Sequence, residues 1–308
     1  MKPKIISIVT PSYNQGRFIE ETIQSVLCQE GEFCVDYIIM DGESTDSSVE
    51  IIKKYEKLLE ENCKIVKKNG LKYFVKAQEN FQWNRCLGIS YRWESKRDNG
   101  QVDALNKGLD MANGQVLAFL NSDDAYYRSV FQRIAKIDWQ AVDFVYGKGM
   151  WLSEQGRELL SYPTFAPTKY NLFYQCTLCQ PTIFFSREMF RELGGFSMDY
   201  PDIFDYEYWI RAVFAHKTFW YVDKLLAKSR MYKENKSMAQ RNSISKQVGR
   251  LKQNYYSHSR QKLSKIKLFF TQFVVQRKTV NRVNKLFKYL GNDLRYNFWK
   301  SVKRFTDL

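Results

Sequence analysis

Two adjacent aspartates, Asp123 and Asp124, stand in the stretch LAFLNSDDAYYR at residues 117–128. The apolar run at 117–120 predicts a buried strand, so the two carboxylates at its end would repel each other unless a positive charge lay beside them. Magnesium and manganese bind carboxylate oxygens and often complete their coordination with the phosphates of a substrate. The pair therefore predicts a divalent metal site, and its alternative role is to cap a helix over residues 126–136.

The segments around the aspartates alternate between strand-like and helix-like patterns. This alternation predicts an α/β fold with a mainly parallel sheet and helices on both of its faces. Ligands of such sheets bind beyond the carboxyl ends of the strands, and three polar groups follow strand ends here: Pro11–Asn14, Asp41 and Asn121–Asp124. We expect strands at 4–10, 35–40, 64–68, 72–76 and 115–120, and helices at 17–29, 47–59 and 102–111.

Residues 77–93 do not continue this alternation and predict an insertion. Its Trp83 and Trp93 could stack on a bound sugar or close a small core. We favour the second role, because aromatic side chains pack more often than they bind ligands.

The chain lacks the glycine-rich loops that usually bind phosphates: no G-x-G-x-x-G follows the first strand, and no G-x-x-x-x-G-K-[ST] occurs. A nucleotide bound here would therefore need a cation on the aspartate pair. Cys176-x-x-Cys179 has no second cysteine pair and the chain has only two histidines, which disfavours a zinc or redox site. Six scattered cysteines without a signal-peptide pattern predict a cytoplasmic location.

Basic charge is concentrated at the end of the chain. The chain has 48 Lys and Arg, 33 Asp and Glu, and a formal net charge of +15. Residues 241–308 hold 17 of these basic residues and two acidic ones, so residues 1–240 are neutral overall. Apolar residues recur every seven positions in this tail, at Ile266, Phe273, Val280 and Phe287. The pattern predicts basic amphipathic helices on an anionic membrane surface, or a hairpin packed on the body or on a second copy of the chain.

From about residue 4 to residue 240, but not in the tail, the chain resembles glycosyltransferase family 2. The resemblance is carried by six motifs in the order of that family: PSYNQGRFIEETIQSVLCQ, YIIMDGESTDSSVEII, DNGQVDALNKGLDMANGQVLAFLNSDD, CQPTIFF, GGF and DYEYWIR. It implies a GT-A fold and an inverting transferase that uses a nucleotide-sugar. It divides the chain into a catalytic domain at 1–240, with halves at 1–125 and 126–240, and an extension at 241–308.

The resemblance also implies a donor site. It assigns the nucleotide base and ribose to Pro11, Tyr13 and Asp41. Further donor contacts are implied for Asp98, Gln101, Asp103, Lys107, Ser122 and Asp123.

For the metal, Mn²⁺ or Mg²⁺, the resemblance implies Asp123 and Asp124 as ligands, with Asp124 the better candidate for direct contact. Asn121 stands where many members carry an aspartate. Tyr232 stands where relatives often have the histidine of Arg-x-His, so Arg230 is expected to bind the diphosphate together with Lys236.

The catalytic base implied by the resemblance is Asp205, and Glu207 is the second choice. An acceptor hydroxyl must lose its proton as it attacks the anomeric carbon, which one carboxylate can accept. Asp205 could also cap a helix over residues 206–214, and Phe204 stands where many members carry an acid. No Q-x-x-R-W follows, which disfavours a processive synthase.

These observations predict a metal-dependent, inverting, non-processive glycosyltransferase. Its expected donor is a UDP-sugar, and its expected acceptor is a lipid-linked saccharide of cell-surface polysaccharide assembly at the inner face of the cell membrane. Two rival functions are a nucleic-acid-binding protein that uses the basic tail and a GT-A-like scaffold without catalysis. We do not expect nucleic acid as a partner.

Overall fold

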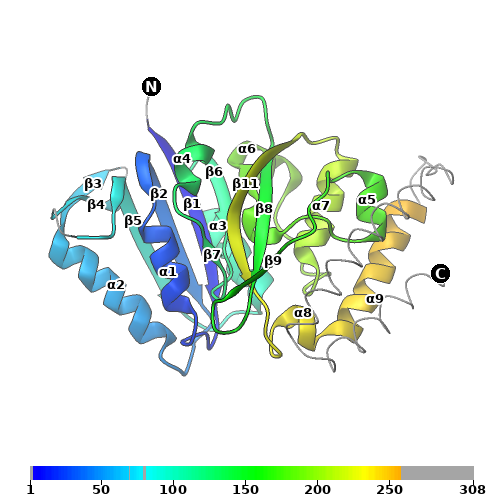
Figure 1. Cartoon of the computed structure of the whole chain (residues 1–308), viewed down its shortest axis with the longest axis horizontal. Helices are drawn as coiled ribbons and strands as arrows, with labels where there is room; N and C mark the ends of the chain where they lie inside the picture. The colour runs from blue at the N-terminus through cyan, green and yellow to red at the C-terminus, as the bar shows by residue number, and fades with distance from the viewer. Residues whose placement is uncertain (1–2, 69, 79–80, 258–308) are drawn as a thin grey trace.

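The computed structural model describes residues 3–68, 70–78 and 81–257. In this part of the chain one mixed eleven-stranded sheet runs through the molecule, with helices on both faces (Figure 1). The strand order is β3-β4-β5-β2-β1-β6-β10-β8-β11-β7, and β9 pairs with β8. The strands are β1 (Lys4–Ser12), β2 (Glu30–Asp41), β3 (Cys63–Lys68), β4 (Leu71–Ala77), β5 (Arg85–Ser95), β6 (Val116–Phe119), β7 (Ala125–Tyr126), β8 (Phe144–Leu152), β9 (Glu158–Ser161), β10 (Phe184–Ser186) and β11 (Phe219–Arg230).

Four central strands, β5, β2, β1 and β6, are parallel, as the alternation in the sequence predicts. On one side of them β3 and β4 pair antiparallel, and on the other β10 runs antiparallel to both β6 and β8. The prediction that residues 77–93 form an insertion is wrong: most of them belong to β5, which pairs along its length with β2. Trp83 and Trp93 pack at the margin of the core, as we favoured.

Helices cover both faces of the sheet (Figure 1), and a separate hydrophobic core lies on each face. In β1, Ile6 and Ile8 face one core and Val9 faces the other. Among the described residues none of the helices has the length and apolar composition that a bilayer span needs. The helices are α1 (Ile19–Leu27), α2 (Ser48–Asn62), α3 (Gln101–Met111), α4 (Val130–Ala135), α5 (Lys169–Tyr174), α6 (Arg187–Leu193), α7 (Phe204–Phe214), α8 (Lys236–Ala239) and α9 (Arg241–Lys252), with a 3-10 turn at Gln180–Thr182 and a π-helical turn at Gln253–Ser257.

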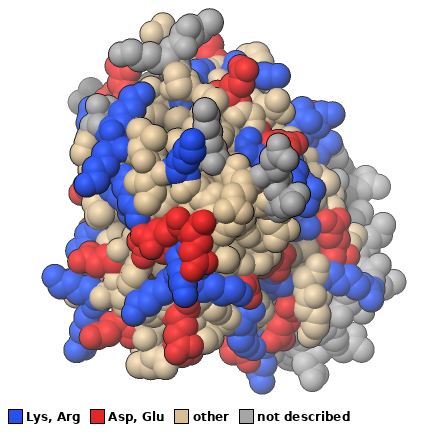
Figure 2. Space-filling view, turned by 90° about the vertical axis from the view of Figure 1, so that its left-hand side faces the viewer, with Lys and Arg blue, Asp and Glu red and all other residues tan. Residues whose placement is uncertain are grey.

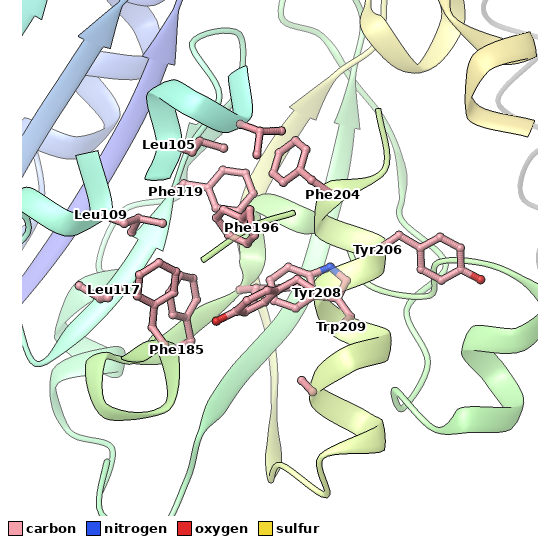
Figure 3. Packing of buried hydrophobic residues seen from close by; sticks show 14 of the residues in the cluster. Leu105, Leu109, Leu117, Phe119, Phe185, Phe196, Phe204, Tyr206, Tyr208 and Trp209 are labelled. Carbon is pink, nitrogen blue, oxygen red and sulfur yellow. The ribbon is translucent and has the colours of Figure 1, made fainter. Parts of the chain in front are cut away.

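An aromatic cluster holds α7 against the central strands (Figure 3). The ring of Phe204, at the start of α7, lies 5.6 Å from the ring of Phe119 at the end of β6. Phe196 packs against both, at 5.2 Å from each. Phe204 is thus a core residue, and its contact fixes the distance between Asp205 and the aspartate pair that follows β6.

The β3–β4 hairpin forms one edge of the sheet. After Cys63, every residue of β3 is exposed on both faces of the strand: Lys64, Ile65, Val66, Lys67 and Lys68. Lys67 lies opposite Lys72 in the register. Figure 2 shows the molecule from the side of this hairpin and α2, where lysine and arginine side chains lie among acidic side chains and uncharged surface.

The predicted domain boundary at residue 240 does not fit the packing. Helix α9 places Val248 and Leu251 in the same core as α7, and Gln247 Nε2 donates to Asp202 Oδ2 at 2.7 Å. The body therefore continues through residue 257. The seven-residue pattern that begins at Ile266 lies outside the described residues.

Candidate active site

The second strand ends in a rigid acidic corner. Asp41 is 2% exposed, and its carboxylate accepts hydrogen bonds from the Ser44 backbone N–H at 2.9 Å and from the hydroxyl groups of Ser44 and Ser95 at 2.6 and 2.7 Å. Asp98 lies beside it: a Cβ on Gly42 would come within 3.0 Å of Asp98 Oδ2. Gly42 therefore permits the approach of the two acids that were predicted to flank the nucleotide.

A small pocket opens at this corner. Its lining includes Asp41, Asp98 and Lys107, together with Lys96 and Arg97. The two basic residues were missed in the sequence analysis, although they directly precede Asp98, because charges in a loop usually face solvent. They give the acidic pocket a positive side.

Two further predicted donor residues reach the same corner through the β1–β2 pairing. Pro11 lies opposite Met40, and the next residue, Ser12, lies opposite Asp41. Tyr13 follows directly and is 63% exposed. An exposed aromatic ring beside a buried carboxylate is suited to stack on a nucleotide base.

Asp103 has a local role. Its carboxylate accepts from the Asn99 backbone N–H at 2.9 Å and from Lys107 Nζ at 2.7 Å, so it orders the turn before α3. Lys107 is therefore held at the pocket by Asp103, and the structure gives Asp103 no direct position at the donor.

The aspartate pair follows β6, as predicted, but it does not cap a helix. The next residues form β7 rather than the start of a helix at 126. Asp124 Oδ1 accepts from the Arg230 backbone N–H at 2.9 Å, and Asp123 Oδ2 accepts from the Tyr232 hydroxyl at 2.9 Å. The end of β11 therefore frames the pair, and Ser122 is buried directly before it.

The electrostatics of the pair fit a divalent cation. Burial raises the pKa of Asp123, and burial together with the charge of Asp123 raises the pKa of Asp124 well above the usual aspartate range. The ionised pair is thus unfavourable unless a positive charge joins it. No group of three His, Cys, Asp or Glu side chains that could hold a metal occurs in the described part of the chain. Two carboxylates that share an ion with substrate phosphates match a Mg²⁺ or Mn²⁺ site.

Arg230 does not reach out to a diphosphate, contrary to our prediction. It is 2% exposed, and its guanidinium donates to the backbone oxygens of Asp123 at 3.0 Å, Glu154 at 3.0 Å and Ser153 at 3.3 Å. It also pairs with Glu21 on α1. These bonds occupy the guanidinium, which therefore supports the loop of the aspartate pair.

Asp205 lies in the first turn of α7, one residue inside the helix rather than at its cap. Burial raises its pKa, against the opposing effects of the Tyr206 backbone N–H, which donates to Oδ1 at 2.8 Å, and of the charge of Lys236. A carboxylate with a raised pKa is suited to accept a proton near neutral pH.

Glu207, the second choice for the base, is a structural residue. It is 3% exposed, and its two oxygens accept from Arg211 Nε and Nη2 at 3.1 and 3.0 Å. The Tyr255 hydroxyl donates to it at 2.8 Å. Its lone pairs are committed to these partners, which leaves Asp205 as the candidate base.

A chain of polar contacts runs from Lys236, whose charge acts on Asp205, to the end of β6. Lys236 Nζ lies 3.3 Å from Gln101 Oε1, and Gln101 Nε2 donates to Asn121 Oδ1 at 2.8 Å. Asn121 Nδ2 in turn donates to Gln180 Oε1 at 3.3 Å. An aspartate at position 121 would lack this donor, which explains the asparagine in physical terms.

The two cysteines of the C-x-x-C segment are free thiols, like the other four. Burial raises the pKa of Cys176 and Cys179, and the charges of Asp124 and Asp205 add to the effect on Cys179. Protonated thiols do not bind zinc or attack disulfides.

Comparison with known proteins agrees with this geometry. The model of the family described as Glycosyl transferase family 2 matches residues 7–91 and 71–194, more than half of the chain. The chain belongs to glycosyltransferase family 2. The predicted fold class and enzyme class are therefore confirmed.

Two relatives carry the names of biosynthetic glycosyltransferases. The chain is 31% identical over 129 residues to the teichuronic acid biosynthesis glycosyltransferase TuaG of Bacillus subtilis, a match that covers 42% of this chain and 40% of TuaG. It is 25% identical over 215 residues to the PGL/p-HBAD biosynthesis glycosyltransferase of Mycobacterium tuberculosis, which covers 68% of this chain and 70% of that protein.

Solved structures share the fold. S. aureus TarS 1–349 in complex with UDP-GlcNAc has a TM-score of 0.56 at 17% identity and covers 92% of this chain and 72% of TarS 1–349. The mannosyltransferase PcManGT of Pyrobaculum calidifontis, in complex with GDP-Man and Mn²⁺, has a TM-score of 0.56 at 12% identity. The match covers 92% of this chain and 73% of PcManGT.

Proposed function

We propose that this family 2 glycosyltransferase is a metal-dependent, inverting, non-processive enzyme that moves a sugar from a nucleotide-sugar to a hydroxyl group of a saccharide. The observation that carries the proposal is the convergence of two carboxylate sites. The rings of Phe119 and Phe204 lie 5.6 Å apart, and Phe119 stands four residues before Asp123 while Phe204 directly precedes Asp205.

The proposed donor site runs from the acidic corner to the aspartate pair. Asp41 and Asp98 bind the base and ribose, with Pro11 and Tyr13 against the base. Gln101 lies between the corner and the pair, where its amide already contacts Asn121. Lys107, Lys96 and Arg97 offset the acids of the pocket.

Asp123 and Asp124 would hold Mg²⁺ or Mn²⁺, with Asp124 in direct contact. When bound, the ion would neutralise the diphosphate and stabilise it as a leaving group. Two of the structures above support this assignment: TarS binds UDP-GlcNAc, and PcManGT binds GDP-Man together with Mn²⁺.

Asp205 acts as the general base in the proposed reaction. The acceptor oxygen attacks the anomeric carbon on the side opposite the diphosphate, so the new glycosidic bond forms as the sugar–phosphate bond breaks. The hydroxyl proton moves to the Asp205 carboxylate. One carboxylate suffices, and the configuration at the anomeric carbon inverts.

We further propose a UDP-sugar as donor and a lipid-linked saccharide of cell-surface polysaccharide as acceptor. The UDP complexes of TarS support the first, and the names of the teichuronic acid and PGL relatives support the second. A cytoplasmic enzyme at the inner face of the membrane would meet such an acceptor, and residues beyond 257 carry the basic charge suited to anionic lipid.

The decisive experiment is a screen of nucleotide-sugars for Mn²⁺-dependent binding and slow donor hydrolysis. Asp124→Ala should abolish metal-dependent binding, whereas Asp205→Asn should keep donor binding and lose transfer by roughly 10²–10⁴-fold. Asp110→Ala, on the exposed side of α3, is the matched control. The proposal fails if no nucleotide-sugar binds, or if Asp124→Ala binds and turns over like the wild type.

A further inference from the structure

The last residue of β11 and the segment that follows it contact the aspartate pair: Arg230 makes two hydrogen bonds, and Tyr232 and Asn235 make one each. Arg230 donates from its backbone to Asp124 and from Nε to the carbonyl of Asp123. The Tyr232 hydroxyl donates to Asp123 Oδ2 at 2.9 Å, and Asn235 Nδ2 approaches the same oxygen at 3.5 Å. Only the last two contacts reach the side chain of Asp123, so they determine where its carboxylate points.

Tyr232 is itself held in place by neighbours from the start of the chain. It is 8% exposed, and its ring lies 5.0 Å from the ring of Phe18, next to α1. The Arg17 guanidinium lies 5.6 Å from the Tyr232 ring centre. The ring therefore has little freedom, and the position of its hydroxyl is set by packing.

Asn235 is fixed in a similar way. Its amide nitrogen donates to the Arg230 carbonyl at 2.9 Å, which closes the turn that carries Tyr232. The two donors thus belong to one rigid loop, built before any ligand arrives.

We propose that Tyr232 is a positioning residue, which holds the Asp123 carboxylate in the orientation that a divalent cation requires. This inference rests on the proposed function of the aspartate pair. Tyr232 acts on the ion through Asp123 and leaves the second carboxylate oxygen of Asp123 for the ion. Hydrogen bonds that orient metal ligands typically change metal affinity by about 10–100-fold when they are removed.

The Tyr232→Phe variant tests this role, because it deletes the hydroxyl and keeps the ring against Phe18. We expect about tenfold weaker Mn²⁺ binding to the full chain, measured by electron paramagnetic resonance with Mn²⁺ alone, and an altered zero-field splitting of the bound ion. Tyr127→Phe is the matched control, since the Tyr127 hydroxyl donates to Glu158 at 2.7 Å. It should bind Mn²⁺ like the wild type.

Each outcome decides the proposal. Weaker binding and a changed spectrum in Tyr232→Phe alone support it, and Asn235→Ala should then show a smaller loss in the same direction. Binding and spectrum equal to the wild type in Tyr232→Phe overturn it. An equal loss in both tyrosine variants also overturns it, because the effect would then not depend on Asp123. If the folded wild-type protein binds no Mn²⁺, either alone or with UDP added, the metal site in the proposed function fails instead.

Discussion

Asp205 couples the chemistry of the site to pH. Because burial raises its pKa, the carboxylate becomes protonated at a higher pH than an ordinary aspartate does. Protonated Asp205 cannot accept the acceptor proton, so kcat/KM should fall on the acid side with an apparent pKa above about 3.9, the ordinary value. A pH–rate profile with saturating metal checks this, and an acid limb at or below the ordinary value would contradict it.

The same burial should cost stability. Below the pKa of the unfolded state Asp205 is protonated in both states and carries no penalty, whereas above its folded-state pKa the full penalty applies. Asp205→Asn, which keeps an oxygen for the Tyr206 N–H, should therefore raise the thermal midpoint at pH 7 without metal or donor. The difference should shrink as pH falls through the folded-state pKa.

Asp199→Asn, an exposed change on the loop before α7, is the control for this measurement. A midpoint that is lower in Asp205→Asn than in the wild type at pH 7 would show that the ionised carboxylate stabilises the fold.

Gly42 provides a test of the donor corner at the scale of one methyl group. A Cβ there would lie 3.0 Å from Asp98 Oδ2, so Gly42→Ala should displace the Asp98 carboxylate. We expect KM for the donor to rise several-fold while kcat changes little, because the aspartate pair and Asp205 lie elsewhere. Gly249→Ala, whose Cβ would meet nothing within 4 Å, is the control. An unchanged donor KM would remove Asp98 from the proposed site.

At the scale of elements, the contact between β6 and α7 sets the distance between the two carboxylate sites. Phe204→Leu should open a gap beside Phe119, lower stability by about 1 kcal/mol and shift Asp205. Transfer should then decline more than donor binding. Phe190→Leu removes a similar ring from the same cluster further from the site and should change stability alone. Equal effects of both variants on transfer would argue against a specific role of the contact.

The sequence predicted the central strands and the polar groups at their ends, because a buried parallel strand has a clear apolar signal. The exception among the central strands is β5, whose residues 85–95 mix charged and aromatic side chains with apolar ones. The helix of the alternative interpretation, over residues 126–136, begins later, as α4 at Val130–Ala135. Ala125 and Tyr126 form β7 instead, which pairs with residues of β11 about a hundred positions away. Long-range pairing overrode the local preference there.

Within the site, residue types were predicted better than residue partners. Asp41 and the aspartate pair stand at strand ends, as the sequence predicted, and their contacts with a donor stay a prediction. The buried bonds of Arg230 and Glu207 could not be anticipated, because they depend on carbonyl oxygens and on Tyr255, which only the fold brings near. The predicted boundary at residue 240 was wrong for the same reason. The sequence does not show which apolar residues α9 contacts, because these contacts form only in the folded chain.

At the scale of the whole molecule, β3 is an open end of an eleven-stranded sheet. Its backbone could pair with an edge strand of another molecule, and Ile65 and Val66, 48% and 46% exposed, would favour this contact. Lys64, Lys67 and Lys68 place like charges along the same strand. Two such edges would repel each other in any pairing.

The lysines of β3 should therefore keep the enzyme from polymerising through its sheet. Replacing Lys64, Lys67 and Lys68 with threonine should produce concentration-dependent oligomers in size-exclusion chromatography. In the wild type, added salt should promote the same oligomers, because screening weakens the repulsion between the lysines. The same replacement at three exposed lysines elsewhere, Lys136, Lys224 and Lys233, should leave the elution unchanged. The lysines of β3, which are remote from the active site, would then determine up to which concentration the enzyme does not oligomerise.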